Sequence, residues 1–313
     1  MRHKIAIQMD DIKNIDYDYD SSFMIGLEGQ KRNYELFVYH PNDLFLDSGI
    51  VKANGFYIEL FDQDKDYFKF ISDKIEIELA EFSFIFLRQD PPFNMHYITS
   101  TYLLDCLPKN TIVINNPTSV RNCAEKILPF KFTEFMPPTL ISQKVDDINI
   151  FLNIHKDIIT KPLYGNGGEG IHRSKEGHLE GLDTDRQYFE MPIMAQKYIP
   201  EIIDGDRRII FIDGEYVGSV ARIPSKGSIK ANFHAGGLAK KTELVYRDKE
   251  IVNTIGKELK ELDLFFVGID IIGNYLTEIN VTSPTGIKQI NKLNNVKLEQ
   301  VFWDKLEAKY KIV

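Results

Sequence analysis

Residues 266–280 read FVGIDIIGNYLTEIN, a pattern that indicates a buried β-hairpin. Polar and apolar residues alternate on both sides of Gly273-Asn274, as expected for two strands joined by a tight turn. Glu278 and Asn280 are two residues apart, so they point to the same face of their strand. Pairing around the turn brings Asp270 opposite or near Glu278.

The predicted hairpin carries two carboxylates and one amide oxygen on a single face. Oxygen ligands of this kind suit Mg²⁺, which keeps further positions for water and phosphate oxygens. Without a cation the neighbouring carboxylates would repel each other, and one pKa would have to rise. A solvated polar face is the alternative, but the apolar neighbours in both strands favour a buried hairpin. We therefore expect Asp270, Glu278 and Asn280 to be metal ligands.

A glycine-rich loop precedes the hairpin at residues 161–170, which read KPLYGNGGEG. Its glycines permit backbone conformations that a Cβ would forbid, and its N–H groups can turn inward around an anion. No Gly-Lys-Ser/Thr ends the loop, so it is not a Walker A motif. Lys161 stands at the end of a predicted strand, from which it can reach nucleotide phosphates. Taken alone, the motif also fits a flexible hairpin with a solvent-exposed lysine.

The chain as a whole reads as α/β structure in two or three packed lobes, because 313 residues are many for one core. Apolar runs predict strands at residues 4–9, 34–39, 82–87, 111–115, 139–142 and 158–161, and periodic segments predict helices at 21–32, 96–107, 146–155 and 249–262. Strand, helix, strand at the start indicates a parallel unit. Residues 43–80 are expected to form short strands and one charged helix.

Two polar residues follow predicted parallel strands, where side chains commonly face a ligand crevice. Arg88 follows the strand at 82–87, and Asn115 ends the strand at 111–115. Both are therefore candidates for ligand contact. A turn-capping role fits Asn115 equally well.

The composition excludes several functional classes. A formal net charge of -8 disfavours a nucleic-acid partner. Cys106 and Cys123 are too few for a disulfide scaffold, so we expect two reduced, buried thiols. The N-terminal apolar run is too short for a signal segment, and no stretch approaches the roughly 20 apolar residues of a membrane span. These features predict a cytoplasmic protein that binds neither nucleic acid nor membranes.

These motifs, in this order, closely resemble the prokaryotic-type glutathione synthetases of the ATP-grasp superfamily. The resemblance rests on residues 161–168 and on Asp270 with residues 276–286, and it runs through almost the whole chain. Further matching stretches are Leu87 to Phe93, Asn115 to Pro117, Arg121-Asn122 with Glu125-Lys126, Asp204 to Arg208, and Ala221 to Pro224. The resemblance implies an α/β (α+β) chain with an ATP-grasp fold and an N-terminal parallel α/β, or pre-ATP-grasp, domain.

The resemblance also implies a domain order and a reaction. The N-terminal substrate-side domain would cover residues 1–122, the central ATP-grasp lobe 123–200, and the C-terminal catalytic lobe 201–313 with a lid loop at about 224–240. The reaction would join γ-glutamylcysteine to glycine through an acyl phosphate, converting ATP to ADP and phosphate and giving glutathione. Mg²⁺ would be the metal cofactor, with Mn²⁺ as the alternative ion. The expected assembly is a homo-oligomer such as a tetramer.

Individual residues take roles from the same resemblance. Arg208 and Arg222 would be catalytic, because planar guanidinium groups fit a carboxylate and a developing oxyanion. The residues that would bind ATP are Lys126, Lys161, Gly165, Asn166, Gly167, Gly168, Gln196, Lys197, Tyr198, Ile199 and Asp206. Those that would contact substrate are Arg88, Ser283, Thr285 and Lys230. Asp270, Glu278 and Asn280 would correspond to the magnesium ligands.

The chain departs from the family in the lid, which should keep water from an acyl phosphate. Two positions that usually carry arginine are Lys230 and Leu238. Lys230 keeps the charge but not the bidentate fork, and Leu238 keeps neither. Two other functions stay open: another ATP-grasp carboxylate–amine ligase, such as a D-alanine–D-alanine-type enzyme, and an ATP-binding regulatory module without turnover. Residues 88–93 and 283–286 favour the glutathione reaction over another ligase.

Overall fold

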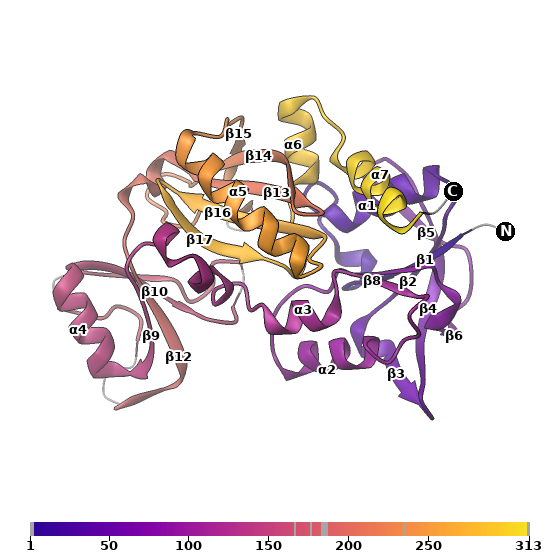
Figure 1. The fold of residues 1–313 in the computed structure, drawn as a ribbon, viewed down its shortest axis with the longest axis horizontal. Coiled ribbons are helices and arrows are strands. Elements are labelled where there is room, and N and C mark those ends of the chain that lie inside the picture. Colours follow the sequence, from indigo (N-terminus) through magenta and orange to yellow (C-terminus); the bar gives the residue numbers. More distant parts are fainter. Residues whose placement is uncertain (1–2, 166, 176, 183–186, 234–235, 312–313) are drawn as a thin grey trace.

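Three β-sheets organise the computed structural model, which describes residues 3–165, 167–175, 177–182, 187–233 and 236–311 (Figure 1). The N-terminal sheet has the strand order β3-β4-β2-β1-β7-β8, with β5 and β6 paired to β4. Its parallel strands are β1 (Lys4–Gln8), β2 (Glu35–Tyr39), β7 (Phe84–Leu87) and β8 (Ile112–Ile114). Helices α1 (Ser21–Lys31), α2 (Met95–Leu104) and α3 (Pro117–Asn122) accompany them. The predicted parallel α/β start is confirmed.

Residues 43–80 differ from the prediction. They form β3 (Leu44–Asp47), β4 (Ile50–Leu60), β5 (Phe68–Phe70) and β6 (Ile75–Glu78), all antiparallel around β4. The expected charged helix is wrong, because its charged residues lie in the turn between β4 and β5 and on exposed strand positions. Short 3₁₀ turns complete the chain at η1 (Ile12–Asn14), η2 (Pro41–Asp43), η3 (Leu79–Glu81), η4 (Leu128–Phe135) and η5 (Pro200–Asp204).

The central lobe is a four-stranded antiparallel sheet with the order β11-β10-β12-β9. Its strands are β9 (Thr139–Lys144), β10 (Asp157–Pro162), β11 (His172–Lys175) and β12 (Tyr188–Lys197). Helix α4 (Val145–His155) packs on the sheet (Figure 1) and buries Val145, Ile148 and Leu152 against Ile158 and Ala195. This small core is separate from the two larger ones of the molecule.

The C-terminal lobe is a five-stranded antiparallel sheet with the order β15-β14-β13-β16-β17. Its strands are β13 (Asp206–Ile212), β14 (Glu215–Ile223), β15 (Leu238–Lys240), β16 (Phe266–Ile272) and β17 (Tyr275–Asn280), and its helices are α5 (Tyr246–Glu261), α6 (Ile287–Asn294) and α7 (Leu298–Tyr310). The hairpin predicted from residues 266–280 is confirmed as β16 and β17. No helix in the described parts of the chain is long and apolar enough to cross a membrane.

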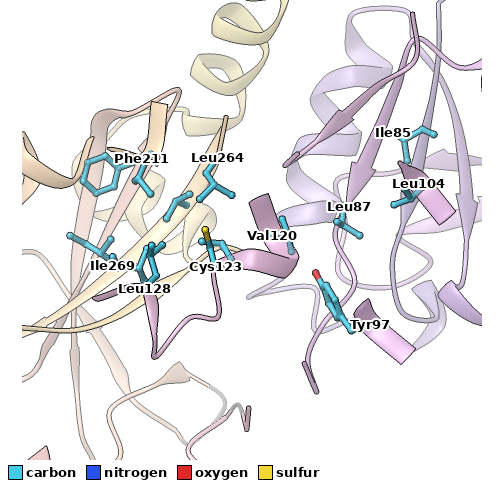
Figure 2. Packing of buried hydrophobic residues seen from close by; sticks show 14 of the residues in the cluster. Ile85, Leu87, Tyr97, Leu104, Val120, Cys123, Leu128, Phe211, Leu264 and Ile269 are labelled. Atoms are coloured by element: carbon cyan, nitrogen blue, oxygen red, sulfur yellow. The ribbon is translucent and has the colours of Figure 1, made fainter. Parts of the chain in front are cut away.

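The C-terminal lobe and the N-terminal sheet share their hydrophobic cores. Helix α7 lies beside α1 (Figure 1), and the fully buried Trp303 donates from Nε1 to the Ile25 carbonyl at 2.8 Å. A Cβ at Gly29 would lie 2.5 Å from the Trp303 ring, so the close packing of these helices requires glycine. Figure 2 shows a second shared core, in which Val120, Cys123 and Leu128 lie between the two lobes.

The two cysteines are both free, but their environments differ. Cys123 is buried in the shared core, as predicted. Cys106 is exposed, so the prediction of a buried thiol is wrong there. The reason is local, because Cys106 follows the last turn of α2 and its Sγ donates to the Tyr102 carbonyl.

Asn115 joins the N-terminal sheet to the C-terminal sheet. Its Nδ2 donates to the carbonyls of Phe266 and Val281, each at 2.8 Å, and its Oδ1 accepts from the Phe266 N–H at 2.7 Å. All of these groups are buried and cannot hydrogen-bond to water, so the Asn115 side chain supplies the hydrogen-bond partners of these backbone groups. Asn115 therefore holds two lobes in register instead of facing a ligand.

Asn115→Ala should destabilise the protein by about 2–4 kcal/mol, because buried backbone groups of Phe266 and Val281 would lose their partner. The measurement is the shift of the urea unfolding midpoint. Asn42→Ala, at an exposed position, is the matched control and should stay within about 0.5 kcal/mol. Equal shifts in the two variants would contradict the structural role of Asn115.

Candidate active site

A cavity of about 510 Å³ lies where the three lobes meet. The central lobe contributes the glycine-rich loop and the end of β12, and the C-terminal lobe contributes β13, β14, β16 and β17. The N-terminal lobe contributes Asp90 and Pro91, just after β7. Most of the charged residues predicted for the site line this cavity.

The register of the β16–β17 hairpin places Asp270 directly opposite Glu278, and Gly268 opposite Asn280. The predicted juxtaposition of the two carboxylates is therefore confirmed. Asn280 Nδ2 donates to Asp270 Oδ2 at 3.2 Å, which leaves its Oδ1 available as an acceptor. Asp270 is buried, while Glu278 and Asn280 are half-buried on the cavity wall.

Arginines compensate the charge of Asp270. Arg208 forms a bidentate pair with it, at 2.5 Å from Nε to Oδ1 and 2.9 Å from Nη2 to Oδ2. Arg222 Nη2 lies 2.9 Å from the same Oδ2. Burial by itself would raise the pKa of Asp270, but the two guanidinium groups outweigh it and hold this pKa well below its ordinary value.

Lysines compensate the charge of Glu278. Lys161 Nζ lies 3.2 Å from Glu278 Oε1, and Lys126 Nζ lies 3.9 Å from the same oxygen. Burial would raise the pKa of Glu278, and the two lysines lower it. Lys126 also donates to the Gly165 carbonyl at 2.6 Å, which ties the glycine-rich loop to the hairpin. Both lysines are buried, so they form a fixed cationic patch on the wall.

The donor set fits Mg²⁺ only in part. Two carboxylates and one amide supply hard oxygen ligands and leave several positions of an octahedral shell for water or phosphate. Among the described residues, no group of three His, Cys, Asp or Glu side chains could hold an ion. A metal at Asp270, Glu278 and Asn280 would therefore depend on the phosphates of a bound nucleotide for its remaining ligands.

Asp206 keeps an unsatisfied oxygen at the cavity. Its Oδ2 pairs with Arg222 Nη2, but its buried Oδ1 has no hydrogen-bond partner in the described structure, and neither does Arg222 Nε. Burial raises the pKa of Asp206 to about 6, with a further contribution from Asp270 that Arg222 offsets. Since buried polar groups are normally paired, these atoms indicate a place where a ligand supplies the missing contacts.

The strand end predicted to meet adenine also lines the cavity, at residues 196–199. Gln196 Nε2 donates to Thr139 Oγ1 at 3.0 Å, and the N–H groups of Lys197 and Tyr198 donate to the carbonyls of Pro138 and Asp157. The guanidinium of Arg173 stacks on the Tyr198 ring at 3.4 Å. These contacts fix the strand end at the cavity.

Most of the predicted site residues lie on the cavity wall. They are Lys126, Lys161, Gly165, Gly167, Gly168, Gln196, Lys197, Tyr198, Ile199, Asp206, Arg208, Arg222, Lys230, Asp270, Glu278, Asn280, Ser283 and Thr285. Asn166 lies outside the described residues. Arg88 is not among the residues that line the cavity.

Arg88 instead supports the wall from behind. Its Nε donates to Ser22 Oγ and its Nη2 to the Pro284 carbonyl, both at 3.0 Å, and its guanidinium lies over the Phe266 ring. Burial lowers its pKa. Through Pro284, Arg88 holds the turn that carries Ser283 and Thr285 to the cavity.

Part of the predicted lid segment lines the cavity. Residues 229–233 line it, and Lys230 and Asn232 lie next to Gly168 of the glycine-rich loop. The buried Phe233 stacks on Tyr19 of the N-terminal lobe at 5.2 Å between ring centroids. Leu238 lies on β15 and is 70% exposed, so the position that lacks the family's arginine faces solvent.

Several wall residues, among them Glu125 and Asp90, had no predicted role. Glu125 accepts from Thr282 Oγ1 at 2.6 Å, and burial raises its pKa. Asp90 lies on the N-terminal part of the wall. Both belong to stretches that carried the family resemblance. For Glu125 the available signal was its place next to Lys126, which the resemblance assigns to phosphate binding.

A larger cavity of about 1130 Å³ lies across the loop from Lys161 to Gly165. Apolar side chains such as Phe93, Met95 and Met191 dominate its wall. It lacks Asp270, Glu278, Arg208 and Arg222, so we place the candidate active site in the smaller cavity, which these residues line.

Comparison with known proteins places the chain among enzymes of one family. The N-terminal domain of prokaryotic glutathione synthetase matches residues 3–121, and the ATP-grasp domain of the same family matches residues 125–295. The glutathione synthetase of Agrobacterium fabrum is 44% identical over 308 residues, which are 97% of this chain and 96% of the relative. That of Brucella melitensis is 42% identical over 312 residues, 99% of this chain and 100% of the relative.

Solved structures support the fold assignment. The D-cycloserine synthetase DcsG superposes with a TM-score of 0.64 at 12% identity, covering 97% of this chain and 99% of that one. The ATP-grasp ligase PsnB complexed with minimal precursor gives a TM-score of 0.64 at 14% identity, covering 98% and 99%. At such low identity these likenesses establish the ATP-grasp fold alone.

Arg222→Met should destabilise the protein at pH 7 by about 3–5 kcal/mol, because the carboxylates of Asp206 and Asp270 would lose a buried counter-charge. Without Arg222 the pKa of Asp206 rises further above about 6. A raised carboxylate pKa costs stability above the unfolded value, and this cost shrinks as pH falls.

The measurement is urea unfolding of the parent and Arg222→Met at pH 7 and pH 5. The difference between the two proteins should be smaller at pH 5. Arg222→Lys keeps the charge and should lose less stability at pH 7. A difference that does not depend on pH would contradict this account of the charge network.

Proposed function

The chain belongs to the prokaryotic glutathione synthetase family of ATP-grasp ligases, and from that premise we propose that it joins γ-glutamylcysteine to glycine. ATP would be converted to ADP and phosphate, and glutathione would be the product. The observation that carries this proposal is the single cavity in which two buried lysines, two arginines and a carboxylate hairpin meet.

The first step is phosphoryl transfer from ATP to the cysteine carboxylate of the dipeptide. A carboxylate is a poor electrophile, and phosphorylation converts it into an acyl phosphate with a good leaving group. Such a step depends mainly on positioning and on charge neutralisation. Lys126 and Lys161 would supply positive charge to the phosphates, and the N–H groups of Gly165, Gly167 and Gly168 would surround them.

Asp270, Glu278 and Asn280 would hold Mg²⁺, or Mn²⁺ as the alternative. When bound, the ion would neutralise charge on the phosphates of the nucleotide. Asp270 pairs with Arg208 and Arg222, and Glu278 pairs with Lys126 and Lys161. These ion pairs stabilise the buried hairpin.

The second step is attack of the glycine amine on the acyl phosphate. The tetrahedral intermediate carries negative charge on oxygen, and phosphate leaves as it collapses. Arg208 and Arg222 are buried and fixed by Asp270 and Asp206, so they would offer preorganised donors to this oxygen. Lys230 and the covering lid would limit the access of water to the acyl phosphate.

The remaining assignments are proposals that follow from the family. Residues 196–199 and Asp206 would complete the ATP site, and Ser283, Thr285 and Arg88 would bind or support the dipeptide. The division into lobes at residues 1–122, 123–200 and 201–313 agrees with one sheet in each. We propose a cytoplasmic homo-oligomer, such as a tetramer.

The purified protein should release ADP with γ-glutamylcysteine, glycine and Mg²⁺-ATP together, and should form glutathione in equal amount. Steady release should fall to background when either substrate is omitted. Without γ-glutamylcysteine no carboxylate accepts the phosphoryl group, and without glycine each active site would form the acyl phosphate only once. D-Alanine as both substrates is the comparison that tests the other type of ligase. ADP release with D-alanine alone, and none with the first pair, would reject the proposal.

Glu278→Gln should reduce turnover by about 100-fold or more, because one of two metal carboxylates would be lost. ADP release is the measurement, and a far-UV circular dichroism spectrum matching the parent shows an intact fold. Glu59→Gln, an exposed carboxylate outside the cavity wall, is the matched control and should keep full activity. Unchanged turnover in Glu278→Gln would remove this residue from the metal site.

A further inference from the structure

Asp90 differs from the paired carboxylates of the cavity wall. Asp206, Asp270 and Glu278 each lie within 4 Å of an arginine or lysine. Asp90 forms no ion pair with any residue in the described parts of the chain. It keeps accessible surface where it lines the cavity together with Pro91 and the turn at Ser283, and the surrounding wall partly desolvates its carboxyl group.

The surroundings of Asp90 add negative charge. The backbone N–H of Asp90 donates to Asp10 Oδ2 at 2.9 Å. The negative charge of Asp20 repels the Asp90 carboxylate. Burial and the charge of Asp20 raise the pKa of Asp90, while Ser283 hydrogen-bonds to its side chain and lowers it. The nearby cation, Arg88, directs its donors to Ser22 and Pro284. The buried guanidinium of Arg88 therefore acts on Asp20 and Asp90, while Asp10 adds further negative charge beside Asp90, and this part of the wall favours a cation.

The rest of the wall pairs its carboxylates with cations, which can also meet anionic groups of a ligand. Lys126, Lys161, Arg208 and Arg222 all come from the central and C-terminal lobes. A ligand that fills the cavity should therefore carry a cationic group toward the N-terminal lobe and anionic groups toward the other two. A zwitterionic dipeptide held beside a nucleotide has this charge distribution.

We propose that Asp90 binds the α-ammonium group of the γ-glutamyl substrate, with the Ser283 hydroxyl fixing the carboxylate. This inference rests on the proposed function. The α-ammonium keeps its charge throughout the reaction, so a carboxylate can hold it without opposing any step. The amine of glycine must lose a proton before it attacks, and an unpaired carboxylate that stabilised its ammonium form would slow the reaction.

The test compares two substrates that differ only in this group: γ-glutamylcysteine and glutarylcysteine, which lacks the α-amino group. The parent protein should prefer γ-glutamylcysteine in kcat/KM by about 10- to 100-fold, the effect of one charged hydrogen bond. Asp90→Asn should lower kcat/KM for γ-glutamylcysteine by a similar factor and leave that for glutarylcysteine nearly unchanged. Asp90→Glu, which keeps the charge, should retain part of the preference.

Asp64→Asn is the matched control, because it removes one exposed carboxylate of the same lobe away from the cavity. It should leave both substrates unaffected, and an unchanged KM for ATP in all variants shows an intact nucleotide site. Equal losses for the two substrates in Asp90→Asn, or an unchanged preference, would overturn this inference alone. A parent protein inactive with γ-glutamylcysteine would overturn the proposed function and this inference with it.

Discussion

The buried pairing of Asp270 with Arg208 and Arg222 is the interaction on which the cavity depends. Carboxylates cannot be buried with their charge unless cations accompany them. Adjacent strands of the C-terminal sheet supply those cations, since Arg208 lies opposite Asp270 in the β13–β16 register, and Arg222 opposite Asp206 in the β13–β14 register. The sheet therefore carries its own charge compensation. The same groups would meet the metal and the phosphates, so the stability of the hairpin and its chemistry use one set of residues.

The second constraint is the junction between the N-terminal lobe and the C-terminal sheet. Asn115 satisfies backbone groups of two C-terminal segments, and Trp303 joins α7 to α1. Two hydrophobic cores continue across the junction. This rigid contact brings Asp90 and the turn at Ser283 to the same cavity. The central lobe has a small core of its own, so its position depends more on polar contacts such as that between Lys126 and Gly165.

Arg88 and Asp90 belong to one sequence motif but have different structural roles. Arg88 is buried behind the wall and holds the Pro284 carbonyl, whereas Asp90 reaches the cavity. Both residues lie beyond Leu87, the last residue of β7, where the regular alternation of a strand no longer holds, so spacing along the chain does not say which of them meets a ligand. The charge balance around Asp90 appears only when Asp10 and Asp20 are brought beside it by the fold.

The sequence alone determined the hairpin at residues 266–280 and its opposed carboxylates, because alternation and a Gly-Asn turn are local signals. It also determined the parallel start, the glycine-rich loop and, through ordered motifs, the family. Only the tertiary structure decided that residues 43–80 contain no charged helix, that Cys106 is exposed and that Asn115 joins two lobes. It alone decided the pairing of Arg208, Arg222 and the two lysines, and the position of Arg88 behind the wall. The exposure of Cys106 follows from its place after the last turn of α2, whereas the other features depend on contacts between segments far apart in the chain, which no local pattern encodes.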